Sequence, residues 1–294
     1  MKKGLYIFLS LVLIVLMISF ASAGFWDMFT GKASSAPQNV SVTVFGINPV
    51  SISVPAILNG MPNELGVRAI TFDVNVTDPD GVNDINNSEV KAEFTKVGQT
   101  TRIGNCPKQN NINSTTANFT CTVNMLYFDG DGSWNIRVEA RDIGNQTPQN
   151  GTSTFDYGLV RGLSISLSLL LWPGLVTGAT NQNASNDPTI VNNTANYNGP
   201  ISITAYDLLG EATPAENITA NSFTVGALNL ECSGAALSHN SPVSTGISSN
   251  PGNLSAGGGA GQAFIYYCIP VVPIVSSQTY STSQGGNSWL VGYL

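Results

Sequence analysis

A recurring alternation of apolar and polar residues constrains this chain more than any other feature of its sequence. The clearest case is the segment 133–142, where every second residue is apolar: Trp134, Ile136, Val138 and Ala140. A period of two is typical of a strand with one buried and one exposed face. An Asp-Gly-Asp-Gly turn precedes this segment and a Gly-Asn turn follows it. The segment is therefore predicted to be one strand of an antiparallel sheet.

The same period recurs through the first half of the chain, and no segment there has helical spacing. Short antiparallel strands separated by turn residues, about seven in all, are typical of an immunoglobulin-like β-sandwich. We therefore predict such a sandwich over residues 39–158. Its expected strands are 39–44, 51–54, 70–77, 90–94, 117–123, 133–142 and 152–157.

A second β-sandwich is predicted over residues 159–294. Its expected strands are 163–171, 189–192, 201–207, 222–225, 228–232, 263–269, 279–283 and 288–293. Residues 233–262 are rich in Gly, Ser, Asn and Ala and offer too little apolar surface to order themselves. They are predicted to form a long mobile surface loop. The expected fold class is all-β, with two tandem β-sandwich domains.

The N-terminus has the pattern of a secretion signal. Two lysines precede an apolar run over residues 5–20, and Ala-Ser-Ala at 21–23 resembles a cleavage site. Residues 1–23 are therefore expected to be a signal peptide, followed by a tether over residues 24–38. Two alternatives remain open. The apolar run approaches the length of an uncleaved anchor helix, and Lys3-Gly4 resembles a prepilin processing site.

Charged residues make up only 10% of the chain, against roughly 25% in an ordinary soluble domain. The formal net charge is −7, so the basic footprint that phosphate binding needs is missing. Nucleic acid is therefore not expected as a partner. An uncharged polar surface of this kind is common outside cells, and the expected localisation is the extracellular face or the cell envelope.

Four cysteines are divided between the predicted domains, two in each: Cys106, Cys121, Cys232 and Cys268. In an exported chain they are expected to form disulfides. Of the three possible pairings, the one within each domain needs no crossing between domains. Each bond is expected to stabilise the fold by roughly 3 to 4 kcal/mol through restriction of the unfolded chain. A zinc site is the rival interpretation, and the lack of C-x-x-C spacing counts against it.

The sequence also contains eleven acceptor sites for N-linked glycans. These are Asn39, Asn75, Asn86, Asn113, Asn118, Asn145, Asn150, Asn183, Asn192, Asn217 and Asn253. Two of them, Asn75 and Asn118, fall on the polar side of predicted strands, where a glycan would meet solvent. The chain is therefore expected to be glycosylated in a host that has the machinery.

Two aspartate-rich turns suggest a weak calcium site. Asp78 and Asp80 lie in Asp-Pro-Asp-Gly, and Asp129 and Asp131 in Asp-Gly-Asp-Gly. Calcium in proteins takes six to eight oxygen ligands, which clustered carboxylates can supply. The spacing of an EF-hand is absent, and Asp, Gly and Pro are also the residues that tight turns require. Turn formation is the preferred interpretation, and no other cofactor is expected.

No residue is predicted to be catalytic. The single histidine, His239, lies among Gly and Ser residues, and no nearby residue is expected to hold its ring against a carboxylate as a catalytic triad requires. The sequence contains no G-x-S-x-G, P-loop or H-E-x-x-H motif. Tyrosines and tryptophans in the second half are a candidate platform for sugars, although core packing is the preferred interpretation.

Two stretches carry a resemblance to a known family. TFDVNVTDPDGVNDI and LYFDGDGSWNIRVEARDIGN resemble the immunoglobulin-like domains of archaeal cell-surface proteins. The matching residues are Asp78 to Gly81, Trp134, Ala140, Asp142, Gly144 and Asn145. This resemblance covers about the first 160 residues and implies a structural or adhesive role in the cell envelope, with no catalytic residues to transfer.

The function expected on these grounds is that of a non-catalytic surface protein. Its expected partners are other surface proteins or glycans, with self-assembly as a further option, and it would contact a membrane only through an uncleaved N-terminal segment. The alternatives are a subunit of an extracellular filament, either pilin-like or strand-exchanging, and a carbohydrate-binding module.

Overall fold

The computed structural model describes residues 38–42, 44, 46, 48–144, 149–229 and 232–294. Within these ranges the protein is built of β-strands, with three short 3-10 helices. The predicted signal or anchor segment 1–23 and most of the tether 24–38 lie outside the described residues. In the described part of the chain, no helix has the length and apolar character needed to span a membrane.

The strands are short, apart from a few that run for eight to eleven residues. In chain order they are β1 (Ser51–Ser53), β2 (Val67–Thr77), β3 (Lys91–Thr95), β4 (Arg102–Asn105), β5 (Lys108–Asn111), β6 (Thr116–Leu126), β7 (Gly132–Ala140), β8 (Gln149–Tyr157), β9 (Leu163–Ile165), β10 (Thr180–Asn183), β11 (Thr189–Asn193), β12 (Gly199–Thr204), β13 (Leu208–Gly210), β14 (Asn217–Ile218), β15 (Thr224–Gly226), β16 (Ala235–Ala236), β17 (Pro242–Ser249), β18 (Gln262–Val271), β19 (Tyr280–Ser281) and β20 (Leu290–Tyr293). The 3-10 helices are η1 (Ala220–Ser222), η2 (Leu254–Ala256) and η3 (Ser283–Gly285).

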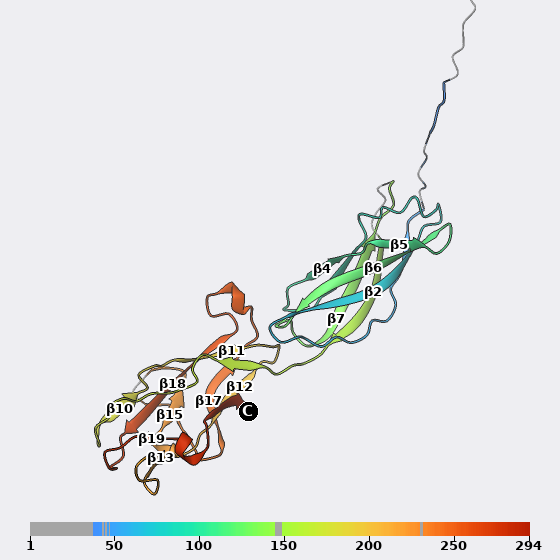
Figure 1. Ribbon diagram of the computed structural model, residues 1–294. Coiled ribbons are helices and arrows are strands. Elements are labelled where there is room, and N and C mark those ends of the chain that lie inside the picture. Colours follow the sequence, from blue (N-terminus) through green and yellow to red (C-terminus); the bar gives the residue numbers. More distant parts are fainter. Residues whose placement is uncertain (1–37, 43, 45, 47, 145–148, 230–231) are drawn as a thin grey trace, which may run out of the picture. The chain divides into compact units, whose positions relative to one another are not determined.

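The first eight strands form one antiparallel sheet in the order β1-β2-β6-β4-β3-β7-β8, and β5 also pairs with β6, on the same edge as β4 (Figure 1). β2 and β6 pair along their whole length, from Val67 opposite Leu126 to Thr77 opposite Thr116. β4 pairs with β6 at one residue only. Ile52 of β1 lies against Gly151 of β8. The sheet therefore folds over a shared interior, an arrangement consistent with a β-sandwich.

Side-chain alternation explains why these segments form strands. In β2 the inward residues from Ile70 to Val76 are buried while Thr71 and Asp73 are exposed, and β6 and β7 show the same pattern. The interior is filled by large side chains, among them Trp134, Phe119 and Phe94. Burial of each such side chain contributes roughly 1.5 to 3 kcal/mol. The strands predicted over 70–77 and 117–123 are confirmed as parts of β2 and β6, and the strand predicted over 133–142 is confirmed as β7, which ends at Ala140.

The second half of the chain has its own interior and three antiparallel sheets. Their strand orders are β16-β15-β18-β11-β9 with β10 also on β18, β17-β12-β20, and β14-β13-β19 (Figure 1). Phe223 lies near the centre of this core, where its ring meets the edges of Trp172 and Trp289 at centroid distances of 5.2 and 5.0 Å. The all-β prediction is therefore confirmed for both halves.

The stretch 233–262, predicted to be a loop, contains the eight-residue strand β17. It pairs with β12 from Gly199 opposite Ser249 to Thr204 opposite Pro242. Thr245 and Ser249 of β17 are buried, and Val243 and Ile247 are half-buried. The loop prediction is wrong here because the two large apolar residues of β17, Val243 and Ile247, fall on the same face of the strand as Thr245 and Ser249, a pattern that the average composition of the segment hides.

Three strand predictions are also wrong. In the segment 228–232, the described residues Leu228, Asn229 and Cys232 are in no strand. Residues 39–42 and 44 form no strand, and the side chains of Val40, Val42 and Val44 are 78%, 76% and 85% exposed. The strand expected over 163–171 shrinks to β9, because only its first three residues find a partner strand, β11.

Each core contains one disulfide. Cys106, in the β4–β5 connection, bonds to Cys121 of β6, and Cys232 bonds to Cys268 of β18. Both bonds join the cysteines that the sequence predicted, and they are consistent with an oxidising, extracellular environment.

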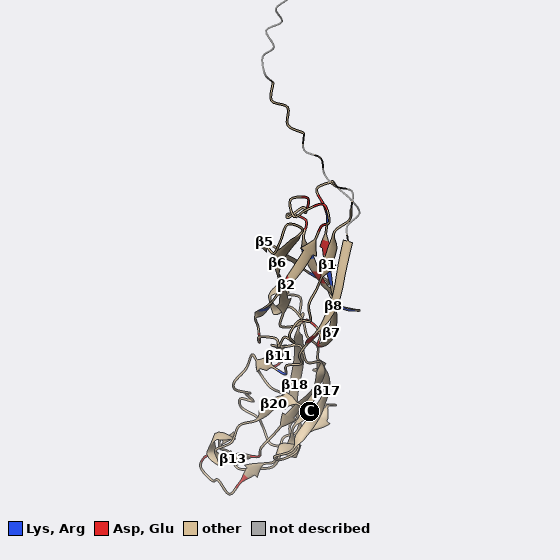
Figure 2. Ribbon diagram, turned by 90° about the vertical axis from the view of Figure 1, so that its right-hand side faces the viewer, with Lys and Arg blue, Asp and Glu red and all other residues tan. Residues whose placement is uncertain are grey.

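Figure 2 shows how the charged residues are distributed. Acidic residues gather beside the start of β1, and no Lys or Arg follows Arg161 in the sequence.

Candidate functional site

Three aspartates of the β2–β3 connection bring their carboxylates together. Asp78, Asp80 and Asp84 each offer one oxygen, and these oxygens lie within 4.8 Å of one another. A tight turn creates this arrangement, because the Gly81 amide donates to the Asp78 carbonyl at 3.1 Å and the Asp80 amide donates to Asp78 Oδ1 at 2.8 Å. Asp78 and Asp84 are buried, whereas Asp80 is exposed. We call these three residues the acidic cluster.

A fourth carboxylate approaches the acidic cluster from the end of β7. The Ile143 amide donates to the Asp84 carbonyl at 2.6 Å, and Ile85 pairs with Asp142 as an isolated bridge. Asp142 is 2% exposed. Burial, followed by the charges of Asp84, Asp80 and Asp142, raises the pKa of Asp78 above its usual value, although the hydrogen bond from the Asp80 amide opposes this. Negative charge is therefore concentrated at this end of the first core.

Two oxygens of the acidic cluster are buried and accept no hydrogen bond from the protein. They are Oδ2 of Asp78, a residue that is 0% exposed, and Oδ1 of Asp84, a residue that is 5% exposed. A buried charged oxygen without a partner is costly. Grouped carboxylate oxygens are also the ligands that hard cations such as calcium prefer. The acidic cluster is therefore the part of the described chain whose chemistry best fits a metal ion.

The structure divides the four aspartates that the sequence grouped as a possible calcium site. Asp78 belongs to the acidic cluster, whereas Asp129 follows the other end of β6, roughly 33 Å away along an eleven-residue strand. Asp129 accepts hydrogen bonds from Arg102 Nε at 3.1 and 3.0 Å and from Arg102 Nη2 at 2.5 Å. Its charge is thus balanced by an arginine. Asp80 lies in the same turn as Asp78, and Asp131 lies in the same turn as Asp129.

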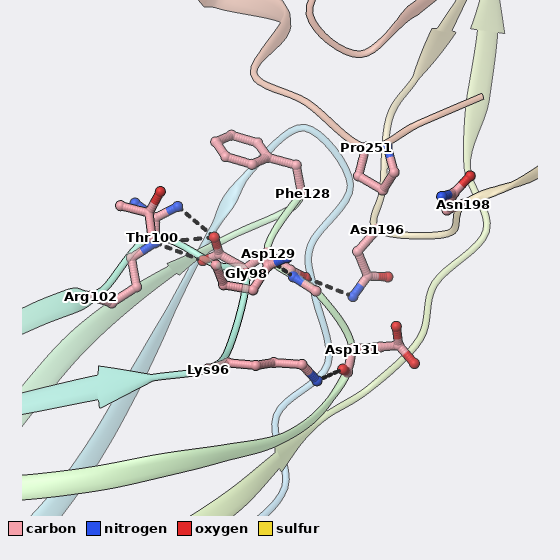
Figure 3. A pocket seen from close by; sticks show the side chains of 12 residues that line it. Lys96, Gly98, Thr100, Arg102, Phe128, Asp129, Asp131, Asn196, Asn198 and Pro251 are labelled. Atoms are coloured by element: carbon pink, nitrogen blue, oxygen red, sulfur yellow. Dashed lines mark hydrogen bonds and ion pairs between the residues drawn. The ribbon is translucent and has the colours of Figure 1, made fainter. Parts of the chain in front are cut away.

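Asp129 and Asp131 line a cavity of about 490 Å³, together with residues of the second half of the chain (Figure 3). Its polar groups bind one another. Lys96 Nζ donates to the Asp131 carbonyl. Asn196 Nδ2 donates to the carbonyls of Asp129 and Gly158 at 3.1 and 2.9 Å. The cavity therefore has the character of a joint between the two cores more than that of a ligand site.

Tyr127 adds a further contact between the two cores. Its hydroxyl donates to the Gly252 carbonyl at 3.0 Å and accepts from the Leu254 amide at 2.9 Å. Tyr127 is 8% exposed, so both hydrogen bonds are shielded from water. Nothing in the local sequence indicates this contact, since its partners are 125 and 127 positions away.

His239 has a partner that the sequence did not indicate. Its Nδ1 lies 3.1 Å from Asp207 Oδ1 and also accepts a hydrogen bond from the Asp207 amide at 3.2 Å. A carboxylate therefore lies beside this ring, contrary to the expectation from the sequence, although the hydrogen bond at Nδ1 comes from the Asp207 amide. The imidazole is 56% exposed, and among the described residues no hydroxyl group contacts its Nε2. The pair lacks the nucleophile that a catalytic triad requires.

The aromatic residues considered as a sugar platform do not form an exposed row. Tyr267 is buried, and none of the others is more than half-exposed: Trp172, Tyr197, Tyr206, Tyr266, Tyr280, Trp289 and Tyr293. The indole nitrogens of Trp172 and Trp289 donate to the carbonyls of Gln182 and Tyr206 at 3.0 and 2.8 Å. These rings build the second core and its rim, as the preferred interpretation of the sequence had it.

The glycan acceptor sites differ in their solvent exposure. Asn145 lies outside the described residues. The exposed acceptors are Asn39, Asn75, Asn113, Asn150, Asn183, Asn217 and Asn253. The half-buried ones are Asn86, Asn118 and Asn192. Asn118 Nδ2 donates to Asn75 Oδ1 at 3.2 Å across the β2–β6 pair, so two acceptors meet on one face of the sheet.

A scan against models of known protein families and a search of curated proteins both found no match to this chain.

Proposed function

We propose that this protein is a non-catalytic structural or adhesive component of the cell surface, exported by its N-terminal segment and held together by disulfides. The observation that carries the proposal is that each of the two cores has its own disulfide, Cys106–Cys121 and Cys232–Cys268. Disulfides persist in oxidising compartments outside the cytosol. The apolar run and the Ala-Ser-Ala pattern at residues 5–23 support export.

The polar groups of the described chain support a structural role more than a catalytic one. At the joint between the cores, Arg102 is already paired with Asp129, and Lys96 donates to the Asp131 carbonyl. His239 has a carboxylate beside it but no nucleophile. We further propose an immunoglobulin-like type for the first sandwich, supported by its strand order, and glycans on its exposed acceptor asparagines.

A filament subunit that exchanges strands is a second candidate, favoured by one observation. Val40, Val42 and Val44 alternate with polar residues as in a strand, yet their side chains are exposed and their backbone is in no sheet. An extended apolar segment of this kind can add to the sheet edge of another molecule. Under this proposal the same chain would assemble outside the cell.

Intact-mass measurement of protein released from native cells, combined with sedimentation, tests both proposals. We expect a chain that begins near Gly24, lacks the four thiol hydrogens of two disulfides, and carries added glycan mass. Sedimentation as a monomer would favour the structural or adhesive role, and sedimentation as long polymers the filament. A cytosolic chain with four free thiols would contradict the export proposal altogether.

A further inference from the structure

We propose that a calcium ion binds the carboxylates of Asp78, Asp80 and Asp84 and fastens the chain at Gly46 and Asn48 to the β2–β3 connection. The inference goes beyond a structural role for the disulfide-bonded cores. It assigns calcium to the acidic cluster as its ligand, and attachment of Gly46 and Asn48 as the consequence of calcium binding. It is independent of where the protein is located, because it concerns the purified chain.

The spacing of the acidic cluster fits calcium. Calcium binds oxygen at 2.3–2.6 Å, so two oxygens on opposite sides of one ion are at most about 5.2 Å apart. The cluster oxygens lie within 4.8 Å of one another and can share one ion without a change of backbone. Magnesium requires a stricter octahedral geometry at shorter distances. Asp142 lies beside the cluster and adds to its negative potential.

The buried oxygens without partners are the independent sign that a ligand belongs here. Asp78 Oδ2 and Asp84 Oδ1 are shielded from water and accept no hydrogen bond. The geometry of the turn needs only Asp78 Oδ1, which accepts from the Asp80 amide. It does not explain why Asp78 Oδ2 is buried as well. A cation in contact with these oxygens removes the cost of burying them.

Two carboxylates of the acidic cluster, those of Asp80 and Asp84, also hold an upstream part of the chain. Asp84 Oδ2 accepts from the Gly46 amide at 2.7 Å. Asp80 accepts from the Asn48 amide at 2.9 Å and from the Asn48 side chain at 2.9 Å. Any side chain at position 46 would overlap the Asp80 carboxylate, so this close approach requires glycine.

The carboxylates of the acidic cluster would therefore bind the calcium ion, and those of Asp80 and Asp84 also accept the hydrogen bonds from Asn48 and Gly46. Without a cation, the like charges of Asp78, Asp80 and Asp84 repel one another and disfavour the orientation that accepts the two amides. With calcium bound, this repulsion is removed and each carboxylate is fixed. Calcium binding and attachment of Gly46 and Asn48 are then coupled, and each strengthens the other.

Titration calorimetry on the purified, disulfide-bonded protein tests the binding. We expect one calcium site, with a Kd in the range of about 10⁻⁴ to 10⁻³ M that is common for extracellular modules. Asp80→Asn is expected to weaken binding by about tenfold or more, because it removes a charged ligand. Asp131→Asn is the matched control, since Asp131 is also an exposed acid in an Asp-Gly turn, and it should leave the affinity unchanged.

Hydrogen exchange tests the fastening, and thermal unfolding in a chelator verifies that both variants fold. Calcium should slow exchange of the Gly46 and Asn48 amides in the wild-type protein and in Asp131→Asn, and much less in Asp80→Asn. Three results would overturn the proposal: no binding heat and no rise of Tm at roughly 10 mM calcium, equal loss of affinity in the two variants, or equal affinity for magnesium. Binding without slower exchange would overturn the fastening.

Discussion

The ion pair between Arg102 and Asp129 is enclosed by the protein, and its removal should be costly. The Asp129 side chain is 1% exposed and that of Arg102 is 17% exposed. Arg102→Ala would leave a buried carboxylate without its cation, which costs about 3 kcal/mol or more in free energy of unfolding. Urea unfolding of the purified protein measures this change.

Arg137 provides the matched control for this prediction. It also binds a carboxylate, Glu93, with its Nη2 at 2.6 Å, but its side chain is 45% exposed. Exposed pairs are worth about 0 to 1 kcal/mol. Arg137→Ala should therefore change the free energy of unfolding far less than Arg102→Ala. Equal losses would show that Asp129 does not depend on its arginine.

Asp187 should make the second core less stable as the pH rises. Burial raises the pKa of its carboxyl from 3.8 to about 6, against an opposing hydrogen bond from the Tyr267 amide. The folded state therefore binds the proton more tightly than the unfolded state, so stability is highest below about pH 4, falls between about pH 4 and 6, and is level above that range.

Asp187→Asn tests this dependence, because the amide oxygen can still accept from Tyr267. The variant should lose the slope between about pH 4 and 6 and gain about 1 kcal/mol at neutral pH. This gain is smaller than the full shift implies, because the group is half-buried. Chemical unfolding at several pH values measures it, with Glu211→Gln as a control at an exposed carboxylate. An unchanged slope in Asp187→Asn would contradict the prediction.

At the scale of the element, the paired strands β2 and β6 limit where glycans can sit. Asn75 and Asn118 are directly opposite, and their side chains are hydrogen-bonded to each other. The threonine hydroxyls of both acceptor sequences are also used across the sheet, Thr77 with Thr116 and Thr120 with Asp73. A glycan on Asn118 would displace its hydrogen bond to Asn75, so the two sites compete for space.

In protein from a glycosylating host, we expect each molecule to carry a glycan at Asn75 or at Asn118, but not at both. Asn75→Gln should therefore raise the occupancy of Asn118, whereas Asn217→Gln, at an exposed site far along the chain, should not. Peptide mapping by mass spectrometry gives the occupancy of each site. Molecules with glycans at both positions in a folded protein would refute the competition.

Local alternation predicted those strands that bury one complete face, such as β2, β6 and β7. It missed short strands with few apolar residues, including β4 and β5, because these strands bury no complete face, although each pairs with a strand next to it in the sequence, β4 with β3 and β5 with β6. The reverse failure occurred at 39–44, where the alternation is clear but the described residues have no partner strand. An alternation with a period of two indicates which segments can form strands. It does not indicate whether another strand lies beside them as a partner.

The sequence also does not show which turns lie close together in the fold, and this explains why it grouped the acidic residues differently from the structure. Asp78 and Asp80 were singled out correctly as neighbours of one another. Asp129 was grouped with them, although β2 and β6 are antiparallel and the two turns follow opposite ends of the pair. Asp84 belongs to the same aspartate-rich stretch of the sequence, and its approach to Asp78 depends on the turn that the Gly81 amide closes. The antiparallel pairing of β2 with β6 is what separates the two turns.

At the scale of the molecule, the sequence indicated two cores and their separate disulfides but not the contacts that join them. The hydrogen bonds of Tyr127 with Gly252 and Leu254, and of Thr194 with Glu64, link residues more than a hundred positions apart. Single tyrosine, threonine and asparagine side chains make these contacts. They leave no periodic pattern, so only the folded chain reveals them.

The disulfide between Cys232 and Cys268 also determines how the chain responds to tension. Its two cysteines are 36 positions apart and enclose β17 and most of the Gly-rich stretch before β18. A pull on the two ends of the protein passes through the sulfur–sulfur bond and bypasses the enclosed segment. About 120 Å of contour length is thereby withheld from stretching. Under shear, the chain would extend by that much less even after its second core had come apart.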